Sequence, residues 1–191
     1  MGRIVVQQFV SADGFGADSN GAFTLFDDMG GGASREFDEA NAEWASAIGA
    51  IVLGASTYRM FVEYWPTDAS EADPIADRLN AAPKYVLSRN LPAAPWGAYA
   101  PATVIAGDAA ALVREVADRH GDVVVWGSFD VTDQLFRAGA VDDLRLVVLP
   151  VLLGDGVRPV PTDLRRRPVE RVASRAFPDG LVELEYALSP R

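Results

Sequence analysis

Three short segments of the sequence place glycine or hydroxyl residues directly after an apolar run. They are residues 54–57 (Gly-Ala-Ser-Thr), 87–90 (Leu-Ser-Arg-Asn) and 126–129 (Trp-Gly-Ser-Phe). Where such a segment joins a strand to a helix, the free N–H groups and the positive dipole end of the helix attract phosphate. Arg89 adds a guanidinium that can hydrogen-bond a phosphate through two N–H groups. These residues therefore favour the binding of a phosphate-bearing ligand.

Each segment alone is a weak signal, because short turns between strands and helices use glycine and serine for structural reasons as well. Neither the glycine pattern of dinucleotide-binding domains nor the phosphate-loop signature occurs in the chain. In open α/β sheets, ligands bind at the edge where the carboxyl ends of the strands lie. The three segments together therefore predict a dinucleotide site at that edge.

Composition excludes several other chemistries. The chain has 191 residues, which fits a single domain spanning residues 1–191, and it contains no cysteine. Disulfides, thiolate metal sites and a cysteine nucleophile are thereby excluded. His120 is the single histidine, too few for an ordinary histidine zinc site, and we expect no metal. The net charge of −10 argues against nucleic acid or an anionic membrane as a partner.

We also expect a cytoplasmic protein. The N-terminal residues lack the apolar core of a signal peptide. Apolar runs such as residues 146–153 are too short to span a bilayer.

Strand-like and helix-like segments alternate along most of the chain, after a long glycine-rich loop at residues 14–32. Strands are predicted at residues 4–10, 50–53, 84–87, 102–105, 123–126 and 144–149. Helices are predicted at residues 35–47 after Ser34, after the turn at 54–57 through Met60 and Phe61, after Asp73-Pro74, after Asp108 and at 129–137. The first of these helices carries an apolar stripe, namely Phe37, Ala40, Trp44 and Ile48.

The last part of the chain differs from this alternation. Residues 169–177 and 181–188 flank a Pro-Asp-Gly turn and predict an antiparallel hairpin. The whole order of elements predicts an α/β fold. We expect a mostly parallel central sheet, helices on both of its faces and the hairpin at an edge.

A longer series of segments follows in the order found in a known family. The series begins with Ser-Ala-Asp-Gly at residues 11–14 and continues through residues 54–58, 64–66, 84–89, 104–108, 125–128, 141–146 and 150–154. It covers nearly the whole chain and resembles the dihydrofolate-reductase-like family, which includes the C-terminal reductase domain of bacterial riboflavin biosynthesis. The resemblance implies a three-layer sandwich, NADPH as hydride donor, a small heterocyclic substrate of the pterin or pyrimidine type, and a homodimer.

The resemblance also implies roles for individual residues. In the family, the turn before residue 58 holds cofactor phosphates, Arg89 occupies the position that meets the adenosine phosphate, and residues 127–128 replace a Gly-Gly pair beneath the nicotinamide. The implied cofactor-binding residues are Gly54, Ser56, Thr57, Ser88, Arg89, Gly127, Ser128, Phe129, Asp130 and Val131. Ala55 stands where the family has an arginine, so one guanidinium is missing from the phosphate site.

The proton donor is open between two places. In dihydrofolate reductases a carboxylate on the first helix binds the substrate and serves protonation. Here that helix carries three glutamates on one face, which is also typical of a solvated surface, and Glu39 is our catalytic candidate. Asp13 is the other, although aspartate before glycine is also a common turn residue. Trp65 and Gly154 are expected beside the substrate.

Two functions remain open from the sequence. The first is an NADPH-dependent reductase of a small pterin-like or pyrimidine-like heterocycle, in which the protein supplies binding and orientation. The alternative is a non-catalytic homodimer that binds a nucleotide or small molecule on the same fold. Ala55, the serine at position 128 and the lack of a convincing acid favour this alternative.

Overall fold

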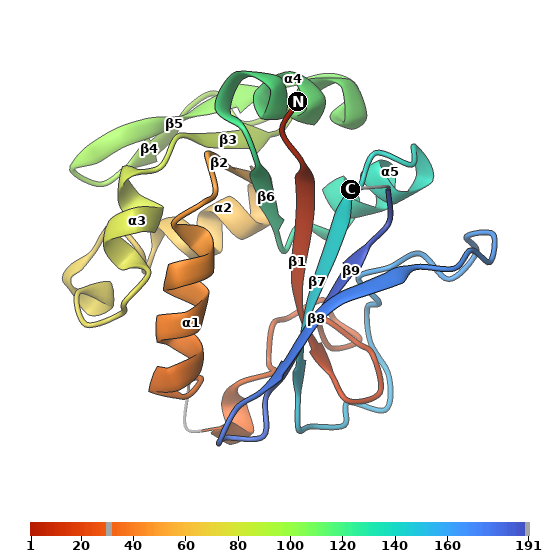
Figure 1. Cartoon of the computed structure of the whole chain (residues 1–191). Helices are drawn as coiled ribbons and strands as arrows, with labels where there is room; N and C mark the ends of the chain where they lie inside the picture. Colours follow the sequence, from red (N-terminus) through yellow and green to blue (C-terminus); the bar gives the residue numbers. More distant parts are fainter. Residues whose placement is uncertain (30–31, 190–191) are drawn as a thin grey trace.

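The computed structural model describes residues 1–29 and 32–189, and its strands form one sheet (Figure 1). The nine strands run in the order β4-β5-β3-β2-β6-β1-β7-β9-β8. They are β1 (Ile4–Ser11), β2 (Ala50–Gly54), β3 (Lys84–Leu87), β4 (Ala94–Trp96), β5 (Tyr99–Ile105), β6 (Val123–Trp126), β7 (Asp143–Leu149), β8 (Glu170–Ala176) and β9 (Val182–Ala187). Neighbours from β5 to β7 are parallel, whereas β4 and the β8–β9 hairpin pair antiparallel. The predicted mostly parallel sheet with a C-terminal hairpin is confirmed.

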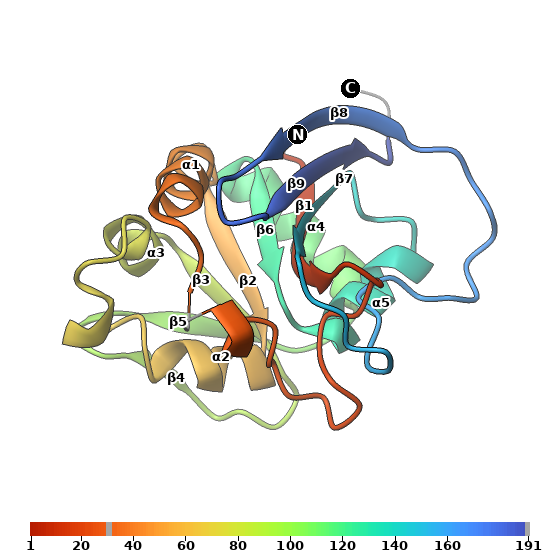
Figure 2. The same ribbon diagram turned by 90° about the horizontal axis from the view of Figure 1, so that it is seen from below.

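Helices cover both faces of this sheet (Figures 1 and 2). They are α1 (Arg35–Ala45), α2 (Ala55–Val62), α3 (Ala76–Ala81), α4 (Ala109–His120) and α5 (Phe129–Arg137), with short 3₁₀ turns at Asp27–Met29 and Asp68–Ser70. Helices α4 and α5 share a core with Val6 and Val125, whereas α1, α2 and α3 share a core with Leu53 and Val124. The fold is therefore the predicted α/β sandwich. In the part of the chain that the structure describes, no helix combines the length and apolar character needed to cross a membrane.

Capping residues set the starts of two helices as predicted. Ser34 Oγ accepts a hydrogen bond from Phe37 N–H at 3.3 Å, and Asp108 accepts one from Ala111 N–H at 2.8 Å. Helix α3 instead begins two residues after Pro74, so the prediction that Asp73-Pro74 opens it is wrong. The Asp73 carboxylate and carbonyl accept hydrogen bonds from the N–H groups of Ile75 and Ala76, which forms a turn ahead of the helix.

The sheet has one edge strand that the sequence does not predict. Strand β4 contains Pro95, which lacks an N–H and is tolerated only at an edge. It pairs antiparallel with β5, which consequently begins at Tyr99, three residues before the predicted start. Trp96 is fully buried and donates its indole N–H to Asn80 Oδ1 at 2.7 Å. A single buried tryptophan therefore anchors a strand whose sequence carries little strand signal.

The long loop after β1 packs on the sheet. Leu25 is fully buried, and the Phe26 ring contacts the Phe9 ring with centroids 5.2 Å apart. An isolated bridge joins Ala17 to Val157. Residues 30–31 of the predicted loop lie outside the described residues.

The strand order fixes where a ligand can enter. Strands β2 and β6 are neighbours, but the chain leaves β2 through α2 toward β3 and leaves β6 through α5 toward β7, on the opposite side. Adjacent strands whose connections diverge leave a crevice at their carboxyl ends. This crevice brings Gly54, at the end of β2, to the Gly127-Ser128 pair that follows β6.

A buried polar chain crosses the sheet beside this crevice. Trp126 N–H donates to Gln7 Oε1 at 2.7 Å, Gln7 Nε2 donates to Asn41 Oδ1 at 3.1 Å, and Arg145 Nη1 donates to the same oxygen at 2.6 Å. The Arg145 side chain is only 2% exposed, and it also pairs with Glu183 on β9. The chain links β6, β1, α1, β7 and β9, and a buried guanidinium of this kind requires all of its acceptors.

The predicted apolar stripe of α1 is consequently rotated. The fully buried face runs through Phe37, Asn41 and Ala45, whereas Ala40 and Trp44 are only half-buried. The polar Asn41 takes this place because Arg145 and Gln7 both donate to it. The Trp44 ring instead stacks on the Arg145 guanidinium, whose Cζ atom lies 4.2 Å from the centroid of the ring.

Glu183→Ala should lower the free energy of unfolding by about 3 kcal/mol, because it leaves the buried Arg145 charge with Glu185 at 3.4 Å as its remaining carboxylate. Urea unfolding measures this loss. Glu170→Ala, at an exposed position of β8, is the control and should change stability by less than about 0.5 kcal/mol. The double variant Arg145→Met/Glu183→Leu should be more stable than Glu183→Ala, and the opposite order would contradict the assignment.

Candidate functional site

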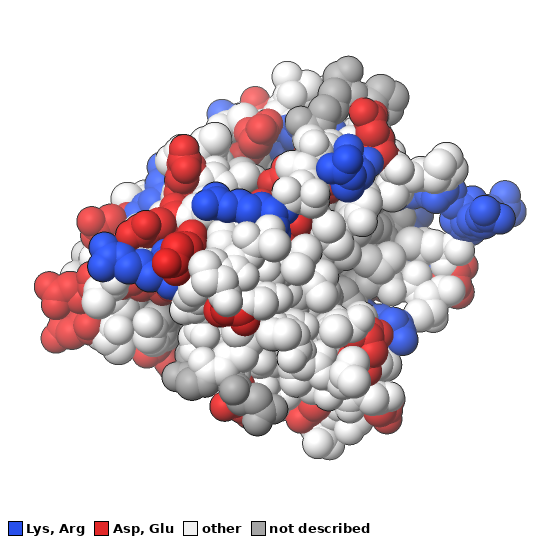
Figure 3. Space-filling view, turned by 60° about the horizontal axis from the view of Figure 1, so that its bottom comes forward, with Lys and Arg blue, Asp and Glu red and all other residues white. Residues whose placement is uncertain are grey.

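A cavity of about 1320 Å³ opens at the carboxyl ends of β1, β2, β3 and β6. Its lining comes from these strand ends, from α1 and α2, and from the start of α5. The volume exceeds the roughly 300–1,000 Å³ of a site for one drug-sized ligand. Figure 3 shows the molecule from this side, with uncharged residues over the centre of the face and most charged residues around its margin. The cavity has room for two ligands side by side.

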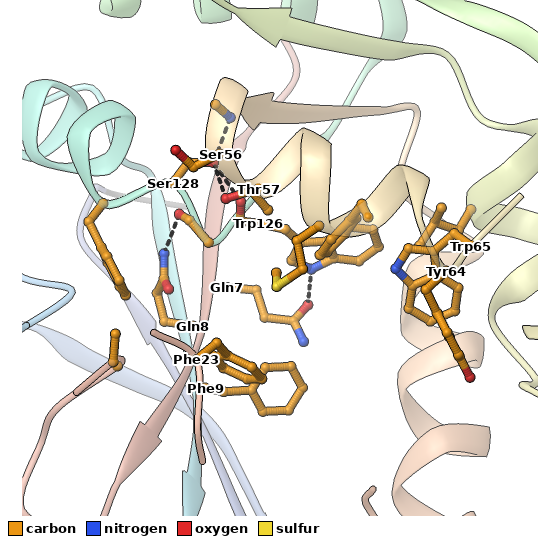
Figure 4. Close-up of a pocket in the computed structure, with 18 of the residues that line it drawn as sticks. Gln7, Gln8, Phe9, Phe23, Ser56, Thr57, Tyr64, Trp65, Trp126 and Ser128 are labelled. Atoms are coloured by element: carbon orange, nitrogen blue, oxygen red, sulfur yellow. Dashed lines mark hydrogen bonds between the residues drawn. The ribbon is translucent and has the colours of Figure 1, made fainter. Parts of the chain in front are cut away.

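One half of the cavity is built on a left-handed corner after β6. Gly127 and Ser128 have φ angles of +54° and +59°, and Ser128 is the one described non-glycine residue with positive φ. Ser128 Oγ accepts a hydrogen bond from Gly54 N–H at 2.5 Å and lies 2.9 Å from Thr57 Oγ1, to which it donates. Gln8 Nε2 holds the corner from the other side by donating to Gly127 O at 2.8 Å (Figure 4). These bonds fasten the two strand ends together.

The corner leaves no room for a side chain at position 127. A Cβ there would lie 2.9 Å from Thr57 Oγ1, and one at Gly54 would lie 3.1 Å from Ser128 Oγ. The close approach of backbone segments brings the N-termini of α2 and α5 to the same wall of the cavity. Two helix N-termini with small residues between them form a surface suited to a diphosphate.

The end of β3 adds a second anion-binding feature. Ser88 Oγ accepts hydrogen bonds from Asn90 N–H at 3.3 Å and Leu91 N–H at 3.1 Å, so this hydroxyl shapes its own turn. Arg89 is exposed and lines the cavity. Among residues 1–29 and 32–189, no carboxylate or carbonyl engages its guanidinium. Arg89 is therefore available to a ligand.

The other half of the cavity is aromatic and acidic. Phe9, Phe23 and Trp65 form apolar walls on either side of Gln7 (Figure 4). Asp38, on α1, lines this half, and burial raises its pKa to about 6, with the nearby Asp73 and Asp179 charges adding to the shift. Burial also raises the pKa of Asp73. The cavity thus holds a carboxyl group that exchanges its proton near neutral pH.

Most of the predicted site residues meet in this cavity. Those that line it are Gly54, Ser56, Thr57, Trp65, Ser88, Arg89, Gly127, Ser128, Phe129, Asp130 and Val131. Apart from Trp65, which follows α2, they come from the ends of three strands, β2, β3 and β6, and they span 77 positions, from Gly54 to Val131. The structure therefore brings the three glycine-containing or hydroxyl-containing segments to one wall.

The structure places both predicted proton donors outside the cavity lining. The Asp13 carboxylate accepts hydrogen bonds from Ser11 Oγ at 2.6 Å and Gly154 N–H at 2.7 Å, and the Ser11 bond is the main reason that its pKa falls to about 2. Asp13 thus joins two loops, one of which carries the exposed Gly154, also outside the lining. Glu39 is exposed and pairs with Arg35 at 2.7 Å.

Sequence reasoning missed Asp38, Asn41 and Gln7, which all line the cavity. Asp38 follows the buried Phe37 and precedes Asn41 by three positions, so it flanks the buried face of α1. This position would have been visible only with the correct stripe for the helix. Gln7 and Gln8 interrupt the apolar run of β1, and polar residues inside such a run were the available signal.

Comparisons with known proteins agree with this geometry. The family profile of the RibD C-terminal domain matches residues 3–182. The uncharacterised protein YyaP of Bacillus subtilis is 25% identical over 191 residues, which covers 96% of this chain and 94% of that protein.

Solved structures with low sequence identity share the fold. A putative riboflavin biosynthesis protein from Shewanella sp. PV-4 has a TM-score of 0.75 at 17% identity, with 97% of this chain and 98% of that chain covered. Dihydrofolate reductase from Enterococcus faecalis, in complex with NADP(H), has a TM-score of 0.61 at 14% identity, with 97% and 95% covered. The dihydrofolate-reductase-like fold is therefore confirmed.

Ser128→Ala should lower the free energy of unfolding by about 1–2 kcal/mol, because the Gly54 N–H loses its acceptor. Ser128→Gly should lose less, since glycine recovers roughly 1 kcal/mol of left-handed backbone cost. Urea unfolding without nucleotide compares the two variants. A glycine variant less stable than the alanine variant would show that the corner is not strained at this position.

Asp38→Asn should stabilise the protein at pH 8 and lose this advantage by pH 4. The raised pKa means that the folded state favours the protonated carboxyl, so wild-type stability is greatest below the unfolded pKa of 3.8 and falls as pH rises through about 6. Because Asp38 is half-buried, solvent screening limits the gain at pH 8 to about 1 kcal/mol.

Urea unfolding at several pH values measures the effect. Glu39→Gln is the matched control on the same helix, and it should show little change because its carboxylate is exposed. Equal stability of Asp38→Asn and wild type at pH 8 would contradict a buried, protonatable Asp38.

Proposed function

Because the chain belongs to the RibD C-terminal domain family, we propose that it is a reductase that uses NADPH to reduce a small pterin-like or pyrimidine-like heterocycle. The observation that carries the proposal is the division of one cavity into two halves. One half has helix N-termini and close backbone approach, and the other has aromatic walls and a proton-exchanging carboxyl. A hydride transfer between a dinucleotide and a ring needs these two surfaces beside each other.

The residues of the first half suit a nicotinamide dinucleotide. Gly127, without a Cβ, lets the corner pack closely against Thr57, and the N-termini of α2 and α5 that meet there suit the pyrophosphate. Arg89 and Ser88, at the end of β3, would meet the adenosine phosphate. When bound, the cofactor supplies the hydride. NADP(H) accompanies the Enterococcus faecalis dihydrofolate reductase, which shares the fold.

The residues of the second half suit a flat substrate. Phe9, Phe23 and Trp65 offer ring faces and edges, and they exclude water from the ring that is reduced. We assign the proton to Asp38 in place of Asp13 and Glu39, because Asp38 is the one of the three that lines the cavity. A carboxyl with a pKa of about 6 is poised to hold a proton and release it near neutral pH.

The alternative is a binding protein without catalysis on the same fold. Ala55 favours it, because the family's arginine is missing from the start of α2. The two functions differ in one observable, the consumption of NADPH in the presence of a ring acceptor. The homodimer implied by the resemblance stays a prediction in both cases.

Titration of the purified protein with NADPH and NADH tests the proposal. NADPH should bind more tightly than NADH. Arg89→Ala should weaken NADPH binding about 10-fold to 100-fold, the range of a charge-assisted hydrogen bond of roughly 1.5–3 kcal/mol. It should leave NADH binding nearly unchanged, since NADH lacks the extra phosphate.

Arg119→Ala is the matched control, because this arginine lies in the last turn of α4 and outside the cavity lining. It should bind both nucleotides like the wild type. An unchanged NADPH dissociation constant in Arg89→Ala would remove Arg89 from the site. No binding of either nucleotide to the wild type would refute the nicotinamide proposal.

A further inference from the structure

We propose that Asn41 selects the substrate by donating a hydrogen bond from its amide nitrogen to a carbonyl oxygen of the ring, so that the substrate is a lactam-type heterocycle. The inference deepens the proposed function, because it concerns the substrate half of the same cavity. It rests on the orientation of two buried amides, on the exposure of one nitrogen to the cavity, and on the charges around it.

Two donor-only groups fix the orientation of the buried amides. The Trp126 indole N–H can only donate, so the atom of Gln7 that faces it at 2.7 Å must be the carbonyl oxygen. The Arg145 guanidinium can only donate as well, so the atom of Asn41 that faces it at 2.6 Å must also be oxygen. Gln7 Nε2 then donates to the same Asn41 oxygen at 3.1 Å. Neither amide can flip without placing two donors against each other.

This orientation turns the Asn41 Nδ2 group away from the network. Asn41 is 8% exposed, yet it lines the cavity. No hydrogen bond joins Nδ2 to any other residue that the structure describes, and Nδ2 is not sealed off in the way that Arg145 Nε is. A buried amide N–H needs an acceptor, and a ligand in the cavity is positioned to supply one. A carbonyl oxygen or an unprotonated ring nitrogen can accept this bond, and we infer the carbonyl because the neighbouring Asp38 can pair with a ring N–H beside it.

Asp38 provides the complementary group. It precedes Asn41 by three positions on α1, so the two side chains are neighbours on one face of the helix, and both line the cavity. An ionised carboxylate accepts from a ring N–H or an amine, while the asparagine N–H donates to a ring carbonyl. A donor and an acceptor side by side match the edge of a lactam, in which N–H and C=O are adjacent.

The charges around this half favour a ring without an anionic group. Asp38 and Asp73 both line it, and burial raises the pKa of each. Arg35 also lines the cavity, but its side chain is 85% exposed and pairs with Glu39 at 2.7 Å. A phosphate placed beside two carboxylates would be repelled, so the uncharged lactam edge faces α1.

A pair of rings that differ at one position tests the inference. The probes are 2-amino-4-oxopteridine and 2,4-diaminopteridine, which present a carbonyl and an amino group at the same place. The wild type should bind the 4-oxo ring at least about tenfold more tightly than the diamino ring, because the diamino ring sets an N–H donor against the Asn41 donor. Asn41→Asp should reverse the preference, since a carboxylate oxygen then accepts from the amino group while Arg145 compensates the added charge.

Two further variants separate this role from a general loss of structure. Asn41→Leu should weaken binding of the 4-oxo ring about tenfold without improving binding of the diamino ring. Asn20→Asp makes the same change of amide to carboxylate at an exposed position outside the cavity lining, and it should keep the wild-type preference. Circular dichroism and urea unfolding verify that each variant is folded.

Ring titrations with and without NADPH distinguish this inference from the proposed function. Absence of nicotinamide binding overturns the proposed function, while the ring preference still decides the role of Asn41. Loss of the 4-oxo preference in Asn41→Leu with an unchanged NADPH dissociation constant supports the inference. A wild type that binds neither ring or binds both equally, or an Asn41→Asp variant that keeps the wild-type preference, would overturn it.

Discussion

The buried guanidinium of Arg145 is the constraint on which the rest of the site depends. The Arg145 side chain is only 2% exposed, and a charge buried to this degree is tolerated only when neighbouring elements supply acceptors for it. Glu183 on β9 supplies the opposite charge, and Asn41 on α1 supplies a carbonyl oxygen. Arg145 thereby ties both β9, the neighbour of β7 in the sheet, and helix α1 to β7. Since Asn41 also accepts a hydrogen bond from Gln7 on the adjacent strand β1, the charge fixes the polar floor of the cavity.

A second constraint is the corner at Gly127-Ser128, which closes the other half of the cavity. The left-handed backbone there costs free energy, and the bond between Ser128 Oγ and the Gly54 N–H offsets it. Because β2 and β6 are joined in this way, the starts of α2 and α5 cannot separate. Trp126 belongs to both constraints, since it precedes the corner and donates to Gln7. The wall proposed for the nucleotide and the pocket proposed for the ring are thus connected through Trp126.

Much of this arrangement can be predicted from the sequence, because buried strands, capping residues and glycine turns are local signals. The order of Gly54, Ser88 and Gly127 after three strands was enough to place them at one edge. Asp38, the proposed proton donor, could not be predicted, because its position in the cavity depends on which side of α1 faces the sheet. An apolar stripe through Trp44 suggested one side, but Asn41 lies on the buried side because Arg145 donates to it. This partner is more than one hundred positions away, so the local sequence carries no signal of the contact. Strand β4 escaped prediction for a similar reason, because its burial depends on Asn80 and not on its own pattern.

The two departures from the family pattern, Ala55 and Ser128, lie close together at the starts of α2 and α5, where a phosphate is proposed to bind. Ala55 removes a guanidinium, and Ser128 takes the Gly54 N–H as its own donor, so neither group is left for a phosphate. The donors that remain are the next N–H groups of α2 and α5, whose attraction for a pyrophosphate does not depend on the nucleotide's second phosphate. In the proposed reductase, discrimination between NADPH and NADH therefore falls on Arg89. In that proposed reductase, one exposed side chain carries a preference that a second arginine would otherwise share.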